Sequence, residues 1–315
     1  MFREWRISGG CGDDLSSTEI DSIAESRHFD NALNGVNRTK ASLSMKLSNR
    51  SATLVACLTL MAASAHAAEV PYVVPLSFSN NLPKVTATMG DLTVPVRLDS
   101  GAYNFGITLS PEDLARAKVR ITGTRHWKDA QGNDLQGRVF IVPELRLGNL
   151  TVHDVPGTES VFAPGYAPPD RDGMLGFSFL KNYVVLVDFK AAELRLYSSE
   201  VPPQCRRHRS PLIVGANGLS SAVRTEFGEL HLGWDTAATG TFIKPGSLNI
   251  ASSAYKVGAT HTLRKFGIGD VELGPVIVRT VDLNVPGLDG LLGYAFFQKH
   301  VVCLDVPGRT VAVGR

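Results

Sequence analysis

The sequence predicts an all-β protein made of two similar lobes, and two observations support this prediction. Short runs of β-branched and apolar residues recur along most of the chain, separated by Gly, Asn and Asp residues that favour turns. In addition, one pattern of strand, acidic turn and later glycine element occurs twice in the same order. The chain has 315 residues, of which 43% are hydrophobic, so it has enough apolar side chains for an ordinary globular core.

The individual elements follow from local composition. Five runs rich in β-branched and apolar residues are expected to be strands: 85–89, 94–98, 139–142, 145–147 and 184–187. One short helix is expected over residues 111–117, because Ser110 is a favourable N-cap and Pro111 is favoured at the first helical position.

The repeated pattern begins in both copies with an apolar strand that ends in Asp, a hydroxyl residue and a small residue. The first copy reads VRLDSGA (96–102) and the second reads LGWDTAA (232–238). Two later segments, DGMLGFSFLKNYVVLVDF (172–189) and DGLLGYAFFQKHVVCLDV (289–306), align with each other without a gap. A match of this length and order indicates an internal duplication.

A Pro-rich polar stretch separates the two copies. Residues 202–211 contain three prolines and a basic run, which is typical of a linker. We therefore assign residues 68–201 to an N-terminal lobe and residues 212–315 to a C-terminal lobe.

The segment before the first lobe has the features of a signal peptide. Residues 45–67 begin with Met and a short basic stretch, continue with the apolar run 51–63 and end in an A-x-A pattern. The apolar run is shorter than the about 20 residues that a membrane-spanning helix needs. We expect cleavage after Ala67, a periplasmic or secreted product and no stable membrane insertion after cleavage. Residues 1–44 are then a non-native or disordered extension, with Met45 as the true start.

Charge and cysteine content limit the possible partners. The net charge is +2, which gives no reason to expect binding to nucleic acid. No C-x-x-C or Cys/His cluster is present, so neither a metal nor another cofactor is expected. After the predicted cleavage only Cys205 and Cys303 remain, either as a disulfide, which export would permit, or as two buried thiols.

The duplicated arrangement resembles the pepsin/retropepsin-like aspartic proteases, and in length it is similar to two retropepsin-like units fused in one chain. In that family an apolar, apolar, Asp, Thr/Ser, Gly, Ala turn is catalytic, and the later apolar, apolar, Gly element crosses beneath it in a psi-shaped loop. The resemblance covers about residues 80–313. It implies a bilobal acid protease fold, a peptide or protein substrate, no cofactor and a monomer.

By this resemblance Asp99 and Asp235 form the catalytic dyad. Two carboxylates that are held close together cannot both ionise easily, so the pair shares one proton. The ionised carboxylate can then act as a general base on water, while the protonated one polarises the scissile carbonyl. The resemblance thus implies an aspartic endopeptidase.

Four neighbours of the dyad are expected to support it. Ser100 and Thr236 would hydrogen-bond across the two turns, and the small residues Gly101 and Ala237 would let the two backbones approach. Ala237 departs from the family, which usually has Gly at this position. Its methyl group strains the turn if φ is positive, because Gly alone adopts such values easily, and only narrows the site if φ is negative.

A flap is expected over the cleft. Residues 124–138 read as a polar hairpin tip between the two motifs of the first copy. Trp127 in this stretch either covers bound substrate or is a core or rim aromatic residue. The stretch 255–269 in the second copy leaves room for a smaller counterpart.

Two other functions compete with the endopeptidase. The first is a catalytically impaired relative that binds extended peptides by main-chain pairing, with chemistry lost through Ala237. The second is a homodimer in which two Asp99 turns meet and the second copy is structural. Substitution of each Asp by Asn distinguishes the three possibilities.

Overall fold

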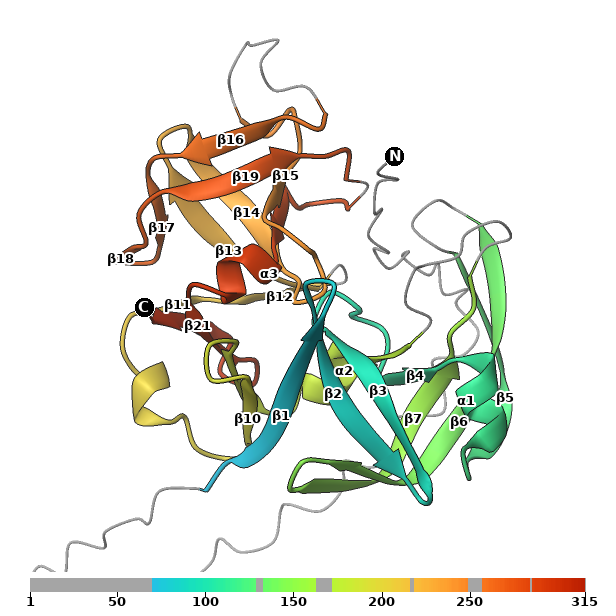
Figure 1. Ribbon diagram of the computed structural model, residues 1–315. Helices are drawn as coiled ribbons and strands as arrows, with labels where there is room; N and C mark the ends of the chain where they lie inside the picture. Colours follow the sequence, from blue (N-terminus) through green and yellow to red (C-terminus); the bar gives the residue numbers. More distant parts are fainter. Residues whose placement is uncertain are drawn as a thin grey trace, which may run out of the picture. The chain divides into compact units, whose positions relative to one another are not determined.

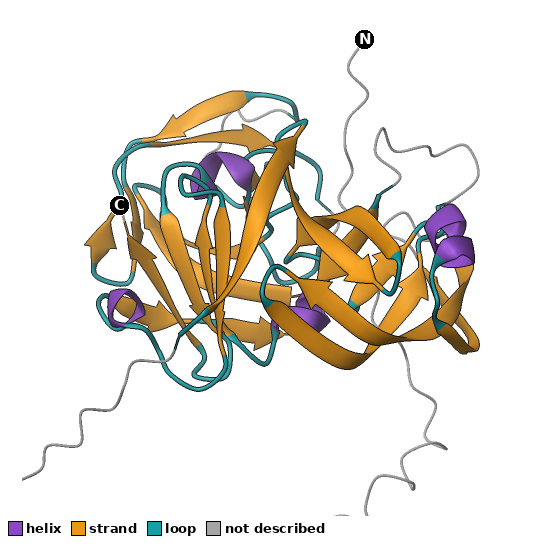
Figure 2. Cartoon of the chain, turned by 60° about the horizontal axis from the view of Figure 1, so that its bottom comes forward, coloured by secondary structure: helices purple, strands orange, loops and turns teal. Residues whose placement is uncertain are grey.

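The computed structural model describes residues 70–314, apart from residues 129–132, 163–171, 216–217, 249–256 and 284. The predicted signal peptide and the extension before it lie outside the described residues. Figures 1 and 2 show that strands dominate the structure and that the helices are few and short. The predicted all-β, bilobal fold is therefore confirmed. No helix in the described part of the chain is long and apolar enough to cross a membrane.

The elements of the first copy are β1 (Tyr72–Ser79), β2 (Leu82–Met89), β3 (Leu92–Asp99), β4 (Ile107–Leu109), α1 (Pro111–Arg116), β5 (Arg120–Lys128), β6 (Asp134–Leu147), β7 (Leu150–Glu159), β8 (Gly173–Gly176), α2 (Phe177–Leu180), β9 (Val184–Asp188) and β10 (Glu193–Tyr197). The second copy and the segment before it contain η1 (Pro203–Cys205), β11 (Arg209–Pro211), β12 (Ile213–Gly215), β13 (Gly218–Thr225), β14 (Gly228–Trp234), β15 (Phe242–Ile243), β16 (Thr260–Leu263), β17 (Phe266–Ile268), β18 (Val271–Glu272), β19 (Val276–Thr280), β20 (Gly290–Leu292), α3 (Tyr294–Phe297), β21 (Val301–Asp305) and β22 (Thr310–Gly314).

The expected elements of the first copy are present, with one difference. The helix begins at Pro111, and the hydroxyl of Ser110 accepts a hydrogen bond from the backbone N–H of Asp113 at 3.0 Å. The strands expected at 139–142 and 145–147 are one continuous strand, β6, which passes through Pro143. Proline fits there because the pairing of β6 with β7 skips this residue, opposite Asp154 with its positive φ of 53°.

Both copies place their motifs in the same topology. In the first, β8 lies between β3 and β4 and runs parallel to β3. In the second, β20 lies between β14 and β15 and runs parallel to β14. The loop that contains each motif Asp therefore leaves a strand, passes over the inserted strand and returns on its other side. This is the psi-shaped loop that the resemblance implied, and it occurs twice.

The two copies share a sheet. Strands β21 and β22 follow the second psi loop in sequence, but β21 pairs with β9 of the first copy, with Cys303 opposite Leu186. The segment 202–211 also contributes, because β11 pairs with β22. This segment is therefore partly a strand and not only a linker. Cys205, at the end of η1, forms a disulfide with Cys303, which decides between the two possibilities for these cysteines.

Candidate active site

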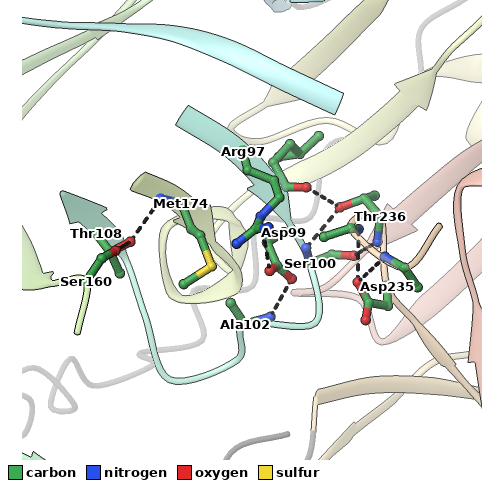
Figure 3. Close-up of polar contacts among 12 residues, drawn as sticks. Arg97, Asp99, Ser100, Ala102, Thr108, Ser160, Met174, Asp235 and Thr236 are labelled. Atoms are coloured by element: carbon green, nitrogen blue, oxygen red, sulfur yellow. Dashed lines mark hydrogen bonds and ion pairs between the residues drawn. The ribbon is translucent and has the colours of Figure 1, made fainter. Parts of the chain in front are cut away.

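Each motif Asp is held by its own turn (Figure 3). Asp99 is the last residue of β3, and Asp235 directly follows β14. Oδ1 of Asp99 accepts the backbone N–H of Ala102 at 3.0 Å. Oδ1 of Asp235 accepts the backbone N–H groups of Ala237 and Ala238 at 2.9 and 3.0 Å. Both side chains are buried, with Asp99 8% and Asp235 2% exposed. The turns thus fix the direction of both carboxyl groups away from bulk water.

The two turns are hydrogen-bonded to each other in a reciprocal arrangement. The backbone N–H of Ser100 donates to Oγ1 of Thr236 at 3.0 Å, and the backbone N–H of Thr236 donates to Oγ of Ser100 at 3.0 Å. Each hydroxyl then donates to a carbonyl oxygen on the opposite side: Ser100 to Trp234 at 2.9 Å and Thr236 to Leu98 at 2.8 Å. All four bonds are buried, so both carboxyl groups are fixed relative to one common frame.

The small residues after each hydroxyl face the opposite turn differently. A Cβ atom added to Gly101 would lie 2.7 Å from Cγ of Asp235, so the first turn has no space for a side chain at this position. Ala237 does bear a methyl group, and the φ angle of this residue is not positive. The departure from the family pattern therefore imposes no left-handed backbone strain on the second turn.

Comparison with known proteins agrees with this geometry. A family model described as aspartyl protease matches residues 85–179, which include the Asp99 turn and the glycine element beneath it. Among solved structures, the aspartic proteinase from Irpex lacteus is similar with a TM-score of 0.54 and 14% identity, covering 78% of this chain and 97% of that one. No curated protein matches the sequence.

These findings support the resemblance to the pepsin/retropepsin-like aspartic proteases: residues 85–179 match the family model, and the chain has the fold of an aspartic proteinase. The family model covers only the first copy, but the second copy repeats its psi loop strand by strand. The family match and the shared fold support an aspartic-protease-like function for the protein. Within the described residues, no group of three or more His, Cys, Asp or Glu side chains is placed to hold a metal ion.

The electrostatic surroundings of the two carboxyl groups differ. Burial raises the pKa of Asp235 to about 7, the negative charge of Asp99 contributes to the rise, and the amides of Ala237 and Ala238 oppose it. Burial also raises the pKa of Asp99, but the positive charge of Arg97 is the largest effect that opposes it. The geometry therefore favours one shared proton near neutral pH, which is the state that a dyad needs.

Arg97 is a site residue that the sequence reasoning missed. Its Nε lies 4.0 Å from Oδ2 of Asp99, and the residue is only 9% exposed. The signal was present in the sequence, because residues two apart on a strand point to the same face. This alternation would have placed Arg97 on the same face of the strand as Asp99.

The predicted flap is an antiparallel hairpin of β5 and β6 in which Trp127 pairs with Leu135, and its tip at 129–132 lies outside the described residues. The half-buried Trp127 ring meets Phe105 edge-to-face at 6.2 Å. The guanidinium of Arg125 lies 5.8 Å from the centre of the same Phe105 ring. Phe105 belongs to the loop that leaves the Asp99 turn, so both side chains attach the hairpin to that loop. Contact between Trp127 and substrate stays a prediction.

The smaller flap expected within residues 255–269 is not formed by the described part of that stretch. Strand β16 pairs with β19, and β17 pairs with β13 and β18. These pairings match those of β6 in the first copy, which pairs with β7 and β2, rather than those of β5. The second copy is shorter because its described residues contain no strand equivalent to β5.

Proposed function

We propose that the protein is an aspartic endopeptidase in which Asp99 and Asp235 together activate a water molecule to hydrolyse a peptide bond. The observation that supports this most is the reciprocal hydrogen bonding of Ser100 and Thr236, which joins two turns that each present a buried carboxyl group. Such an arrangement holds two carboxyl groups in a fixed relationship without any further ligand.

The mechanism follows from one proton shared by two buried carboxyl groups. The ionised carboxylate accepts a proton from water, whose oxygen attacks the carbonyl carbon of the peptide. The protonated carboxyl group donates its proton to the carbonyl oxygen, which gives a tetrahedral intermediate that is not bonded to the enzyme. Proton transfer to the leaving nitrogen then completes cleavage. The amide of Ala102 binds Oδ1 of Asp99, and the amides of Ala237 and Ala238 bind Oδ1 of Asp235, so each turn holds its own carboxyl group in place.

We infer that one chain is sufficient and that it acts after export. Both carboxyl groups come from the same chain, so a monomer with a peptide or protein substrate is the simplest assembly. Residues 45–67 remain our candidate signal peptide. A periplasmic or secreted location is supported by the Cys205–Cys303 disulfide, because such bonds persist in oxidising compartments.

A peptide-binding protein without catalysis is the second candidate, and Ala237 is the observation that favours it. Its methyl group stands where the family usually has the hydrogen of a glycine. The amide of Ala237 still donates to Asp235, however, and its φ is not positive. These two facts support the endopeptidase over the binding protein.

The test is cleavage of a mixed peptide library by the purified protein from pH 3 to 7, with and without pepstatin. Asp99→Asn and Asp235→Asn should each abolish cleavage, because either change removes one half of the dyad. Asp282→Asn, which alters an exposed carboxyl group, is the matched control and should cleave normally.

Each of the other results identifies an alternative. A folded wild-type protein that binds peptides but cleaves none over this pH range would overturn the endopeptidase and support the binding protein. Sensitivity to Asp99→Asn but not to Asp235→Asn would instead support a homodimer of first copies.

A further inference from the structure

The guanidinium of Arg97 is buried beside the dyad without full hydrogen bonding. The residue is 9% exposed, and its Nε is a buried donor without a hydrogen-bond partner in the described structure. An ion pair joins this Nε to Oδ2 of Asp99 at 4.0 Å, and Figure 3 shows the two side chains facing each other. Burying a charge with an unsatisfied donor is unfavourable for folding. Its presence next to Asp99 therefore points to a role other than stabilisation.

The second copy has no equivalent cation. The residue two positions before Asp235 is Gly233, and a Cβ atom there would lie 2.8 Å from Leu291 and 2.9 Å from Leu288. The side chains of these two leucines occupy the space that a long side chain would need at this position. The two halves of the dyad therefore match in their hydrogen bonds but differ in charge.

The positive charge of Arg97 interacts mainly with the carboxyl groups of the dyad. Lys84 on β2 is its cross-strand neighbour, and the Lys84 ammonium forms an ion pair with Asp172 at 2.5 Å. On the other side, Arg97 pairs with the uncharged Met174 of β8. Asp235 is also within electrostatic reach of Arg97. Thus Lys84 has its own carboxylate partner, and Arg97 forms an ion pair with Asp99 among the described residues.

We propose that Arg97 is a positioning residue that decides which half of the dyad is ionised, keeping Asp99 as the carboxylate and Asp235 as the acid. The assignment of chemical roles rests on the proposed endopeptidase function. Asp99 then takes the proton from water while the water oxygen bonds to the peptide carbonyl carbon, and Asp235 gives its proton to the carbonyl oxygen. The dyad as a whole loses no proton in this step.

The positive charge of Arg97 determines how large a pKa shift we expect in the dyad. An opposite charge at about 4 Å lowers the pKa of a carboxyl group by roughly 1–3 units. Without Arg97, the environments of Asp99 and Asp235 would become nearly equivalent, since both are buried and hydrogen-bonded to turn amides. The shared proton would then be distributed over both groups, and the lower of the two apparent pKa values of the dyad would rise.

The experiment is a titration of the aspartate carboxyl carbons by NMR in the full protein, with Asp99→Asn and Asp235→Asn used for assignment. Arg97→Met should raise the lower apparent pKa of the dyad by roughly 1–3 units, and Arg97→Lys should restore most of the difference. Lys84→Met removes a buried cation from the neighbouring strand and is the matched control, with a much smaller expected shift. Arg97→Gln is a second neutral variant in case Arg97→Met fails to fold.

The same variants have a kinetic readout. If the wild type cleaves peptides, the acidic limb of kcat/KM should move to higher pH in Arg97→Met by the shift that NMR measures, but not in Lys84→Met. If the wild type cleaves nothing, the proposed function fails while the titration still decides the role of Arg97. Equal shifts in Arg97→Met or Arg97→Gln and in Lys84→Met would overturn the inference.

Discussion

The side-chain hydroxyls of Ser100 and Thr236 each accept the backbone N–H of the other residue at the same distance, 3.0 Å. The two residues are 136 positions apart in the chain, and each belongs to one copy of the duplicated motif. Their hydroxyl groups also donate to the carbonyl oxygens of Trp234 and Leu98. This exchange makes the position of each Asp dependent on the other copy.

Removal of one hydroxyl should therefore destabilise the protein. Thr236→Val keeps the side-chain shape but leaves the N–H of Ser100 and the carbonyl of Leu98 without their partner. The expected loss is about 1–3 kcal/mol for each buried group that stays unsatisfied, measured by urea unfolding. Thr236→Ser retains the hydroxyl and should lose much less. Equal stability of the Val and Ser variants would contradict this account of the contact.

The raised pKa of Asp235 predicts that stability falls as pH rises from about 4 to about 7. Below the pKa of the unfolded chain, both states hold the proton and the effect vanishes. Between the two values the unfolded state has released the proton and the folded state retains it, so a rise in pH favours unfolding. Asp235→Asn should therefore be more stable than the wild type at pH 7, by on the order of a few kcal/mol, and similar to it below pH 4. Asp282→Asn should show no such pH-dependent gain.

The same ionisation predicts the basic limb of activity. Above a pH of about 7 Asp235 loses its proton, and no proton remains in the dyad for the carbonyl oxygen. We expect kcat/KM for peptide cleavage to decline as pH rises through about 7. Activity that continues to rise well above this pH would show that Asp235 is not the proton donor.

Substitutions of the two small residues in the Asp turns should have opposite effects on peptide cleavage. Gly101→Ala would place a methyl group 2.7 Å from Cγ of Asp235, so the carboxyl group must move. We expect a loss of stability of about 1–3 kcal/mol, and peptide cleavage should fall at least tenfold. Ala237→Gly restores the family residue and should keep or increase cleavage, at a stability cost of about 0.5–1 kcal/mol. Gain of cleavage by Ala237→Gly in an otherwise inactive protein would support the peptide-binding alternative.

The disulfide predicts a redox-dependent stability. Cys205 and Cys303 are separated by 98 positions, and closure of a loop of this length raises the free energy of the unfolded chain by about 4.7 kcal/mol through lost conformational entropy. A reducing agent should lower the urea midpoint of the wild type and leave the double variant Cys205→Ser/Cys303→Ser unchanged. A wild-type midpoint that is insensitive to reductant would show that the bridge contributes little.

Local patterns in the sequence predicted the parts of the fold that depend on local chemistry. The cap at Ser110, strand β3 and strand β9 follow from residue types within a few positions of each other. The pairing of β21 with β9 does not, because it joins segments more than 100 positions apart and depends on which exposed edge each strand meets. The continuous strand through Pro143 was missed because its irregular pairing opposite Asp154 involves a second strand.

The sequence likewise predicted some residues of the candidate site and missed others. The duplicated motif identified Asp99 and Asp235, and the structure brings their turns together through Ser100 and Thr236, while their catalytic role stays a prediction. Arg97 was missed because a family pattern records the residues that members share, and this cation is a difference between the two copies of one chain. A comparison of the copies position by position would have found it.

The shared sheet has a consequence for the solubility of the first unit. Strand β9 is covered on one side by β10 of its own copy and on the other by β21 of the second copy. A fragment that ends near residue 201 would expose β9 as an open edge, which is a ready template for another copy of the fragment or for aggregation. We therefore expect that the first unit, separated from the second, would be less soluble than the whole chain.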